Sequence, residues 1–256
     1  MHDVGQTASR YGGNASPDGL HIFIDASNIV IGFADALKAN RGLDRNTYTR
    51  RPAFDFHSLS LVLERGRPAA KRILCGSLDN SDLEPDYMVQ ARKCDYSVSV
   101  LKRVMKARPV RDPIARKKSG NGYATSGPSS GSDANVPPIM KNGEQAVDEL
   151  LHLNMCDSIL ETEKPATIVL ATGDAAEAEY SGGFLKYVEV ALNKGWKVEL
   201  VCWRKGMAYA WKQPEFLEKW RGKFRIIHLD KYCEELFGVY AEASPDSDWS
   251  DGEWSE

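Results

Sequence analysis

The sequence lacks the features that mark membrane proteins and small secreted proteins. Its five cysteines are scattered through 256 residues with no Cys-x-x-Cys pair, which argues against a zinc site and a disulfide framework and favours a reducing compartment. No apolar run approaches the ~18 residues of a membrane span. The polar, glycine-rich residues 1–19 are unlike a signal peptide. We therefore expect an intracellular protein, cytoplasmic or nuclear.

Motifs for nucleotide cradles are also missing. There is no Walker loop and no Gly-x-Gly-x-x-Gly. The histidines lie near no obvious nucleophile, and His152 sits beside an apolar helical stripe, where packing or a surface position is the usual role. A phosphatase with an aspartyl nucleophile would have a second acid where Ser27 stands.

The composition fits one soluble globular domain with charged ends. Hydrophobic residues make up 42% and charged residues 27%, both ordinary values. We expect a disordered leader over residues 1–19, a single domain over 20–240 and an acidic disordered tail over 241–256. The tail contains six acids and no base, so it is either a solubilising extension or a docking segment for a protein partner.

Apolar runs alternate with helical patterns along the domain. The predicted strands are 20–24, 73–75, 98–104, 167–171, 196–203 and 224–229. The predicted helices are 54–64, one opened by a Ser81–Glu84 capping box and ending near Cys94, one from a cap formed by Asn142 and Gln145 through Ile159, 181–193, two short pieces before 224, and a last one opened by Asp230. This alternation predicts an α/β fold, a three-layer α/β/α sandwich with a mainly parallel central sheet.

One long segment interrupts the alternation. Residues 105–143 show no sustained periodicity, and 119–131 are rich in Gly and Ser. The segment overlaps a basic run, 102–118, that has eight bases against the single acid Asp112. We expect a flexible basic insertion, which is either a solvated loop or a phosphate-binding element.

Three acids are expected to meet at one edge of the predicted sheet. Asp25 follows the first strand, and Asp174 follows the strand at 167–171. Asp148 lies near the start of the helix before that strand. This helix must run antiparallel to the strand, so the N-terminal end of the helix lies level with the same edge. Each acid alone is more simply a turn or cap residue. Together, in the region where open parallel sheets bind ligands, they indicate a site.

Clustered carboxylates repel one another unless cations compensate. Oxygen ligands favour Mg²⁺ or Mn²⁺, which can position a water and stabilise a phosphoryl displacement. Glu177 and Glu179 could add ligands, as could Glu144, one turn before Asp148. Asn28 could contact phosphate or order a metal-bound water, or it could simply cap the following helix.

Four segments, in order, resemble the NYN domains of the PIN-like nuclease superfamily, particularly the fungal branch. They are FIDASNIVIGF, EQAVDELLHLNM, TIVLATGDAAEAEYSGGF and GWKVELVCWRKG, and the resemblance spans roughly residues 20–237. It implies a parallel α/β/α sandwich and Mg²⁺- or Mn²⁺-dependent cleavage of RNA, usually single-stranded. By motif matching, Asp25 is the first metal acid with Asn28 its companion, Asp148 belongs to the central helix, and Asp174 to the turn after the strand.

The chain departs from the family pattern at one position. Related sequences place another acid where Gly182 or Gly183 stands here. Glu177 or Glu179 would have to replace it. Two hypotheses remain: a metal-dependent ribonuclease acting on single-stranded or loop RNA, and a non-catalytic module of the same fold that binds RNA or a protein. A phosphatase of small phosphoesters is a weaker third.

Basic and aromatic residues near the acids would hold the RNA backbone and bases. The candidates in the basic run are Lys102, Arg103, Lys106, Arg108, Arg111, Arg116, Lys117 and Lys118. Arg204 and Lys205 follow the predicted strand at 196–203. Tyr180, Tyr123 and Trp203 are candidates for base stacking, although a role in the core is the simpler expectation for Trp203.

Overall fold

The structure is a computed structural model that describes residues 19–44, 46–49, 52–78, 83–108, 139–143, 146–176 and 181–238. The leader at 1–18, most of the basic insertion and the tail after 238 lie outside the described residues. No helix in the described part of the chain is long and apolar enough to cross a membrane.

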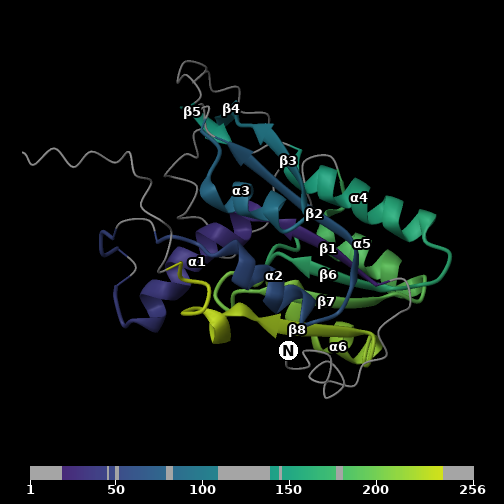
Figure 1. Cartoon of the computed structure of the whole chain (residues 1–256). Coiled ribbons are helices and arrows are strands. Elements are labelled where there is room, and N and C mark those ends of the chain that lie inside the picture. The colour runs from purple at the N-terminus through teal and green to yellow at the C-terminus, as the bar shows by residue number, and fades with distance from the viewer. Residues whose placement is uncertain are drawn as a thin grey trace, which may run out of the picture.

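Six parallel strands form the central sheet (Figure 1). They are β1 (Leu20–Asp25), β2 (Ala69–Leu78), β3 (Ser97–Lys102), β6 (Thr167–Ala171), β7 (Lys197–Cys202) and β8 (Phe224–His228). Their spatial order is β3-β2-β1-β6-β7-β8, so every predicted strand is present. The chain winds outward from β1 to β3 and then returns to the other side of β1, which places the reversal of winding between β1 and β6.

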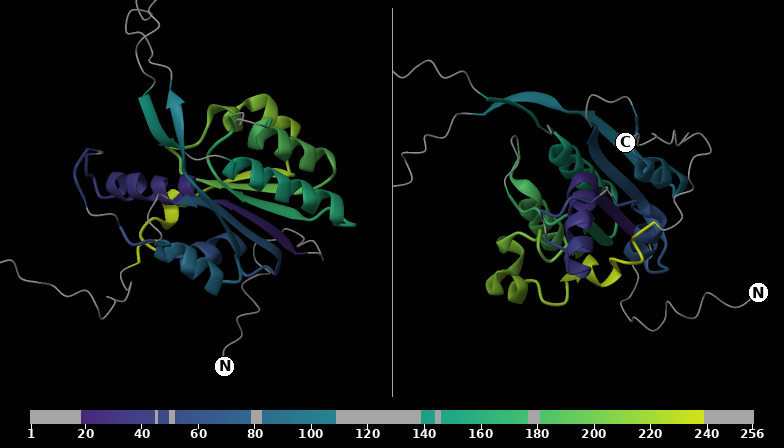
Figure 2. Two further views of the ribbon diagram at one scale, coloured as in Figure 1. Left: turned by 90° about the horizontal axis from the view of Figure 1, so that it is seen from above. Right: turned by 90° about the vertical axis from the view of Figure 1, so that its left-hand side faces the viewer.

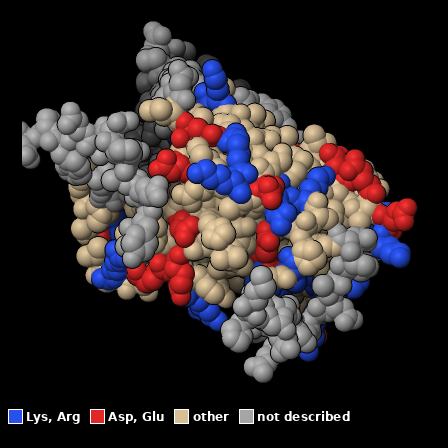
Figure 3. All heavy atoms as spheres, viewed as in Figure 1, with Lys and Arg blue, Asp and Glu red and all other residues tan. Residues whose placement is uncertain are grey.

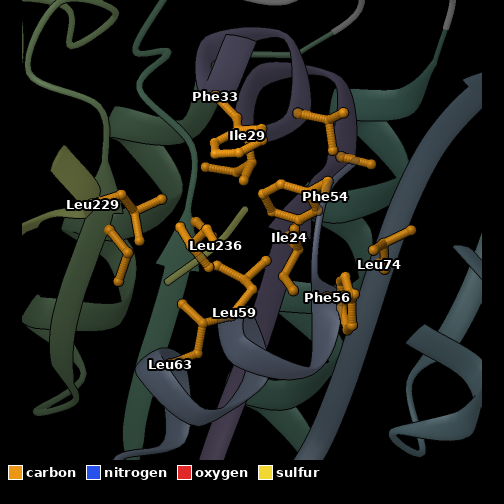
Figure 4. Packing of buried hydrophobic residues seen from close by; sticks show 14 of the residues in the cluster. Ile24, Ile29, Phe33, Phe54, Phe56, Leu59, Leu63, Leu74, Leu229 and Leu236 are labelled. Carbon is orange, nitrogen blue, oxygen red and sulfur yellow. The ribbon is translucent and has the colours of Figure 1, made fainter. Parts of the chain in front are cut away.

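Helices cover both faces of the sheet and complete the predicted three-layer α/β/α sandwich. The helices are α1 (Ala26–Asn40), α2 (Phe56–Glu64), α3 (Asp86–Lys93), α4 (Val147–Glu161), α5 (Gly183–Asn193) and α6 (Pro214–Lys219), with short 3-10 turns η4 (Tyr209–Lys212) and η5 (Leu229–Tyr232). Buried residues of α1, α2 and α3 belong to one apolar cluster, and those of α4, α5 and α6 to another. Figure 4 shows the first cluster, where α1 and α2 pack over β1 and β2.

The central strands supply both clusters because successive side chains point to opposite faces. In β1, Ile22 and Ile24 lie in the first cluster and Phe23 lies in the second. In β6, Val169 and Ile168 divide in the same way. Continuous apolar runs were the signal for these strands, and burial on both faces is its physical cause.

Trp203 belongs to the core, as the simpler expectation held, and its burial excludes base stacking. The side chain is fully buried, and its Nε1 donates to the carbonyl of Ile29 at 2.8 Å. It packs so close to α1 that a Cβ at Gly32 would lie 2.3 Å from Trp203 Cδ1. Glycine at position 32 therefore lets the end of β7 approach the first helix.

Several expected helix starts are wrong because side-chain caps do not form there. Helix α3 begins at Asp86 after Pro85, with no side-chain cap. Glu84 instead pairs with Arg92, and Ser81 lies outside the described residues. Helix α4 begins at Val147 after Ala146, whose φ of 62° is left-handed, and Asn142 lies in a strand rather than at a cap. Asp230 lies inside the short turn η5 rather than opening a helix.

Both ends of the segment 105–143 form regular structure, contrary to expectation. β4 (Val104–Arg108) pairs antiparallel with β5 (Ile139–Gly143) in a separate two-stranded sheet. β4 follows β3 after one residue, so this arm begins at the carboxyl edge of the main sheet. Figure 2 shows the two strands extending beyond the body of the domain. Cross-strand pairing rather than hydrophobic periodicity specifies them. Residues 109–138 lie outside the described part.

A buried carboxylate ties α2 to the far side of the sheet. Glu199 on β7 is 4% exposed and binds three guanidinium groups, those of Arg65, Arg67 and Arg225. Arg67 approaches through two nitrogens, at 2.9 and 2.7 Å. Burial raises the pKa of Glu199, but the arginines outweigh this effect of burial and hold the pKa below its ordinary value of 4.5.

On the face shown in Figure 3, acidic and basic side chains are interspersed without a large area of one sign.

We expect Glu199→Gln to lower the free energy of unfolding by about 3 kcal/mol or more, because it leaves the partly buried Arg65 and Arg67 and the more exposed Arg225 without their shared anion. The contribution of Glu199 is fully present above its ordinary pKa and is lost as the pH falls through its lowered value in the folded state. Urea denaturation at pH 7 and at pH 3.5 measures both effects. Glu218→Gln, which breaks the exposed pair with Arg221, is the control and should change stability by less than ~1 kcal/mol. Equal losses for the two variants would contradict this account.

Candidate functional site

Asp25 ends β1 and caps α1 at the point where the winding of the sheet reverses. Its side chain is 5% exposed. Oδ1 accepts hydrogen bonds from the Ser27 hydroxyl at 3.0 Å and from the Asn28 amide at 3.1 Å. The hydrogen bond from the backbone N–H of Asn28 is the N-cap interaction of α1, so the capping role considered for Asp25 is confirmed. The cap fixes the carboxylate at the carboxyl edge of the sheet.

A buried hydroxyl joins Asp25 to the loop that carries Asp174. Thr172 follows β6 and is fully buried. Its Oγ1 donates to Asp25 Oδ2 at 3.0 Å and accepts from the Asp174 amide at 3.2 Å. One hydroxyl thus bridges two acids that lie far apart in the sequence, and the predicted convergence of β1 and β6 is present. Sequence reasoning missed Thr172, although its place between a parallel strand and Asp174 was the available signal.

Asn28 links the same two segments from the other direction. Its Oδ1 accepts from the backbone N–H of Gly173 at 2.8 Å. The loop is held on its far side as well, because Gly173 O accepts from the Ala208 amide at 2.8 Å. A Cβ at Gly173 would lie 2.6 Å from the carbonyl oxygen of Gly206. Asn28 therefore orders the loop after β6, and the cap of α1 is Asp25 rather than Asn28.

Asp174 is half-buried and forms a tight turn at the same edge. Its Oδ1 accepts from the Ala176 amide at 2.8 Å, and its carbonyl accepts from Trp211 Nε1 at 3.0 Å. The turn is the simple role expected of an Asp after a strand. It leaves Asp174 held from both sides at the edge that the sequence predicted.

Asp148 lies in the first turn of α4, as predicted, and is half-buried. α4 packs against β1 and β2 and its last residue precedes β6, so its first turn lies level with the carboxyl edge. His152 is one turn further along α4, and the charge of Asp174 acts on its ring. Asp148 and Asp174 therefore approach the same region from the helix layer and from the sheet.

The described acids do not by themselves complete a metal site. Among the residues that the structure describes, no group of three or more His, Cys, Asp or Glu side chains is placed to hold a metal ion. Both carboxylate oxygens of Asp25 already accept hydrogen bonds. Glu144, Glu177 and Glu179 lie outside the described residues, so the predicted replacement of the missing acid stays a prediction.

The backbone explains one part of the departure from the family pattern. Gly183 is the first residue of α5 and has a φ of 72°, a left-handed conformation that side chains rarely adopt. Gly182 precedes it with a φ of −77°. The three atoms nearest to a Cβ at Gly182 all belong to the flexible side chain of Lys186, with Cδ at 2.3 Å. An acid is compatible with position 182 but strained at 183.

His152 is a buried packing residue, one of the two roles expected of it. It is 1% exposed, and its ring stacks on Tyr187 and meets Phe184 edge-on. Nδ1 lies 2.8 Å from the hydroxyl of Ser181, just before α5. Burial lowers the pKa of His152 to about 4 against the opposing charges of Glu149 and Asp174. The neutral ring thus ties α4 to the loop before α5.

The predicted RNA-contact residues divide into four groups. Lys102, Arg204 and Lys205 lie at the carboxyl edge, and all three are exposed. Arg103 instead donates from Nε to the hydroxyl of Ser77 at 3.0 Å. Lys106 and Arg108 lie in β4. Arg111, Arg116, Lys117, Lys118, Tyr123 and Tyr180 lie outside the described residues.

Comparison with known proteins does not assign the chain to a family. No family model matches it, and no curated protein does. A crystal structure of a protein of unknown function from Vibrio parahaemolyticus RIMD 2210633 is similar over 84% of this chain and 97% of that one, with 13% identity and a TM-score of 0.42. A likeness at this level carries no argument about function. The NYN resemblance accordingly stays a prediction.

The buried neutral state of His152 should make stability depend on pH. Its pKa of about 4 in the folded protein lies below the ordinary 6.5, so between these values the unfolded chain binds the proton more readily. Stability should fall as the pH drops from 6.5 to 4, by roughly 3 kcal/mol from this residue. We expect His152→Gln to remove that part of the slope in urea denaturation, and His57→Gln, at an exposed histidine, to leave it unchanged. An unaltered slope in His152→Gln would exclude this role.

Proposed function

We propose that the chain is a divalent-metal-dependent ribonuclease that hydrolyses phosphodiester bonds in single-stranded or loop RNA. The proposal rests on where the acids lie in the fold. In open parallel sheets, ligands bind outside the carboxyl ends of the strands where the winding reverses. Asp25 and Asp174 come from the two strands that flank that position.

The observation that carries the proposal is the hydroxyl of Thr172 between the two acids. It binds the Asp25 carboxylate at 3.0 Å and the Asp174 amide at 3.2 Å. Asn28 adds a second link through Gly173. Linked loops of this kind hold acidic groups in a fixed arrangement before substrate arrives, which is what metal-assisted phosphoryl transfer needs.

The residues that would hold Mg²⁺ or Mn²⁺ are Asp25, Asp148 and Asp174, with Glu177 or Glu179 from outside the described part. A bound cation would supply charge stabilisation to the phosphoryl oxygens and a more acidic water. The described acids alone are not grouped as a metal site. This chain's own contribution is to fix the acids: Ser27 and Thr172 hold the carboxylate of Asp25, and Asn28 holds the loop of Asp174.

Substitution of the acids tests the catalytic proposal. We expect Asp25→Asn and Asp174→Asn each to lower Mn²⁺-dependent cleavage of a fluorescent single-stranded RNA by about 100-fold or more. Asparagine caps helices as well as aspartate does, so α1 should survive the first change, as circular dichroism can verify. Asp157→Asn, near the other end of α4, is the control and should cleave normally. Wild-type rates in both edge variants would exclude the proposal.

A second candidate, a non-catalytic module of the same fold that binds RNA or a protein, is favoured by one observation. The Asp25 carboxylate is engaged as a helix cap and a loop anchor, and no described acid group is placed to hold a metal. Under this reading the acids are structural. The phosphatase hypothesis has no such support from the described residues.

Adding an acid at position 182 separates the two candidates. If the ribonuclease site lacks one ligand at this position, Gly182→Asp should increase the rise in melting temperature that millimolar Mn²⁺ produces, because tighter binding to the native state stabilises it by mass action. Gly182→Asn, which has the same shape but no charge, should behave as the wild type. The absence of any Mn²⁺ shift in the wild type and in Gly182→Asp would favour the non-catalytic module.

A further inference from the structure

The segment after β7 carries exposed basic and aromatic side chains and is bonded directly to the loop of Asp174. We call residues 204–212 the 204–212 platform. Ala208 N donates to Gly173 O at 2.8 Å, and Trp211 Nε1 donates to Asp174 O at 3.0 Å. The indole of Trp211 is fully buried and stacks on Phe224. These contacts fix the platform to both the candidate site and the core.

Tyr209 projects from this anchored segment into solvent. It lies in η4 and is 74% exposed, whereas Trp211, two residues later, is buried. Large exposed aromatic side chains on rigid segments are characteristic of surfaces that stack unpaired bases. Burial in the core therefore does not account for Tyr209.

The platform and the neighbouring turn η5 carry exposed cations. Arg204, Lys205 and Lys212 are all exposed. The amide of Arg204 donates to Asp230 Oδ2 at 2.9 Å, which brings η5 and its exposed Lys231 alongside.

The surroundings of His228, at the end of β8, support this grouping. Burial lowers its pKa, and the charges of Arg204, Lys212 and Lys231 lower it further, while Asp230 opposes them. All three cations therefore act on one ring, and they outnumber the acid among them.

We propose that the 204–212 platform binds single-stranded RNA, with Tyr209 stacking on one unpaired base and Arg204, Lys205 and Lys212 contacting the flanking phosphates. The choice of RNA as the polyanion rests on the proposed function. Because the platform is hydrogen-bonded to the loop of Asp174, an RNA strand bound to the platform would run past the candidate site. The basic platform also offsets the negative charge of the acids, which would otherwise repel the substrate.

Fluorescence anisotropy in EDTA measures binding without cleavage. The probes are a labelled 12-nucleotide oligouridylate and an abasic oligomer with the same number of phosphates. Tyr209→Ala should weaken binding to oligouridylate by about fivefold or more and leave binding to the abasic oligomer unchanged, because only the base is lost. Tyr209→Phe keeps the ring and should bind as the wild type does.

The lysines are tested by charge-matched double variants. The double variant Lys205→Gln with Lys212→Gln should reduce the steepness of the plot of log affinity against log salt. The negative slope should become smaller in magnitude by about 1.4, the value for two phosphate contacts on a single strand. Lys197→Gln with Lys223→Gln removes two exposed lysines at the opposite, amino end of β7 and β8 and should leave the slope unchanged.

Two outcomes would contradict the proposal that the 204–212 platform binds RNA. One is an equal loss of affinity for both probes in Tyr209→Ala. The other is equal salt slopes in the two double variants, which would mark a diffuse surface for any polyanion. Since EDTA removes catalysis from the measurement, absence of Mn²⁺-dependent cleavage would reject the nuclease and not the platform.

Discussion

The candidate site depends on one buried contact, the hydrogen bond from the Thr172 hydroxyl to the Asp25 carboxylate. It joins the ends of β1 and β6, the neighbouring strands between which the winding of the sheet reverses. Everything proposed for this edge follows from that junction: Asn28 binds Gly173, Gly173 contacts the segment after β7, and that segment holds Tyr209 beside the loop of Asp174. Hydrogen bonds to a buried carboxylate are strong because the alternative is an unsatisfied charge in a medium of low polarity.

The acids at the carboxyl edge differ in how far the fold already uses their side chains. Asp25 is held as a helix cap, so its orientation is set before any ligand binds. Asp174 and Asp148 are half-buried at the edge and retain more contact with solvent. The opposite end of the sheet contains a different arrangement, in which Glu199 binds three arginines and stabilises the junction of α2 with β7 and β8. The ion pairs of Glu199 thus stabilise the fold near the amino edge, whereas Asp25, Asp148 and Asp174 lie at the candidate site at the carboxyl edge.

The sheet was predictable because its strands are buried on both faces. In runs such as Thr167–Ala171 and Leu20–Asp25, consecutive apolar residues fill both clusters. Boundaries were less predictable where local signals compete: Pro85 rather than Ser81 precedes α3, and Ala146 in a left-handed conformation precedes α4. β4 and β5 escaped prediction because their pairing joins residues more than thirty positions apart.

The sequence by itself determined the α/β class, the parallel sheet and the edge at which Asp25, Asp148 and Asp174 lie, since strands that alternate with helices are joined by crossovers that make neighbouring strands parallel. Only the tertiary structure decided which hydroxyl links Asp25 to the loop of Asp174, that Trp203 is enclosed under α1, and that Tyr209 is exposed while Trp211 is not. Those outcomes depend on contacts between segments distant in the chain, and residue spacing carries no information about how two such surfaces pack.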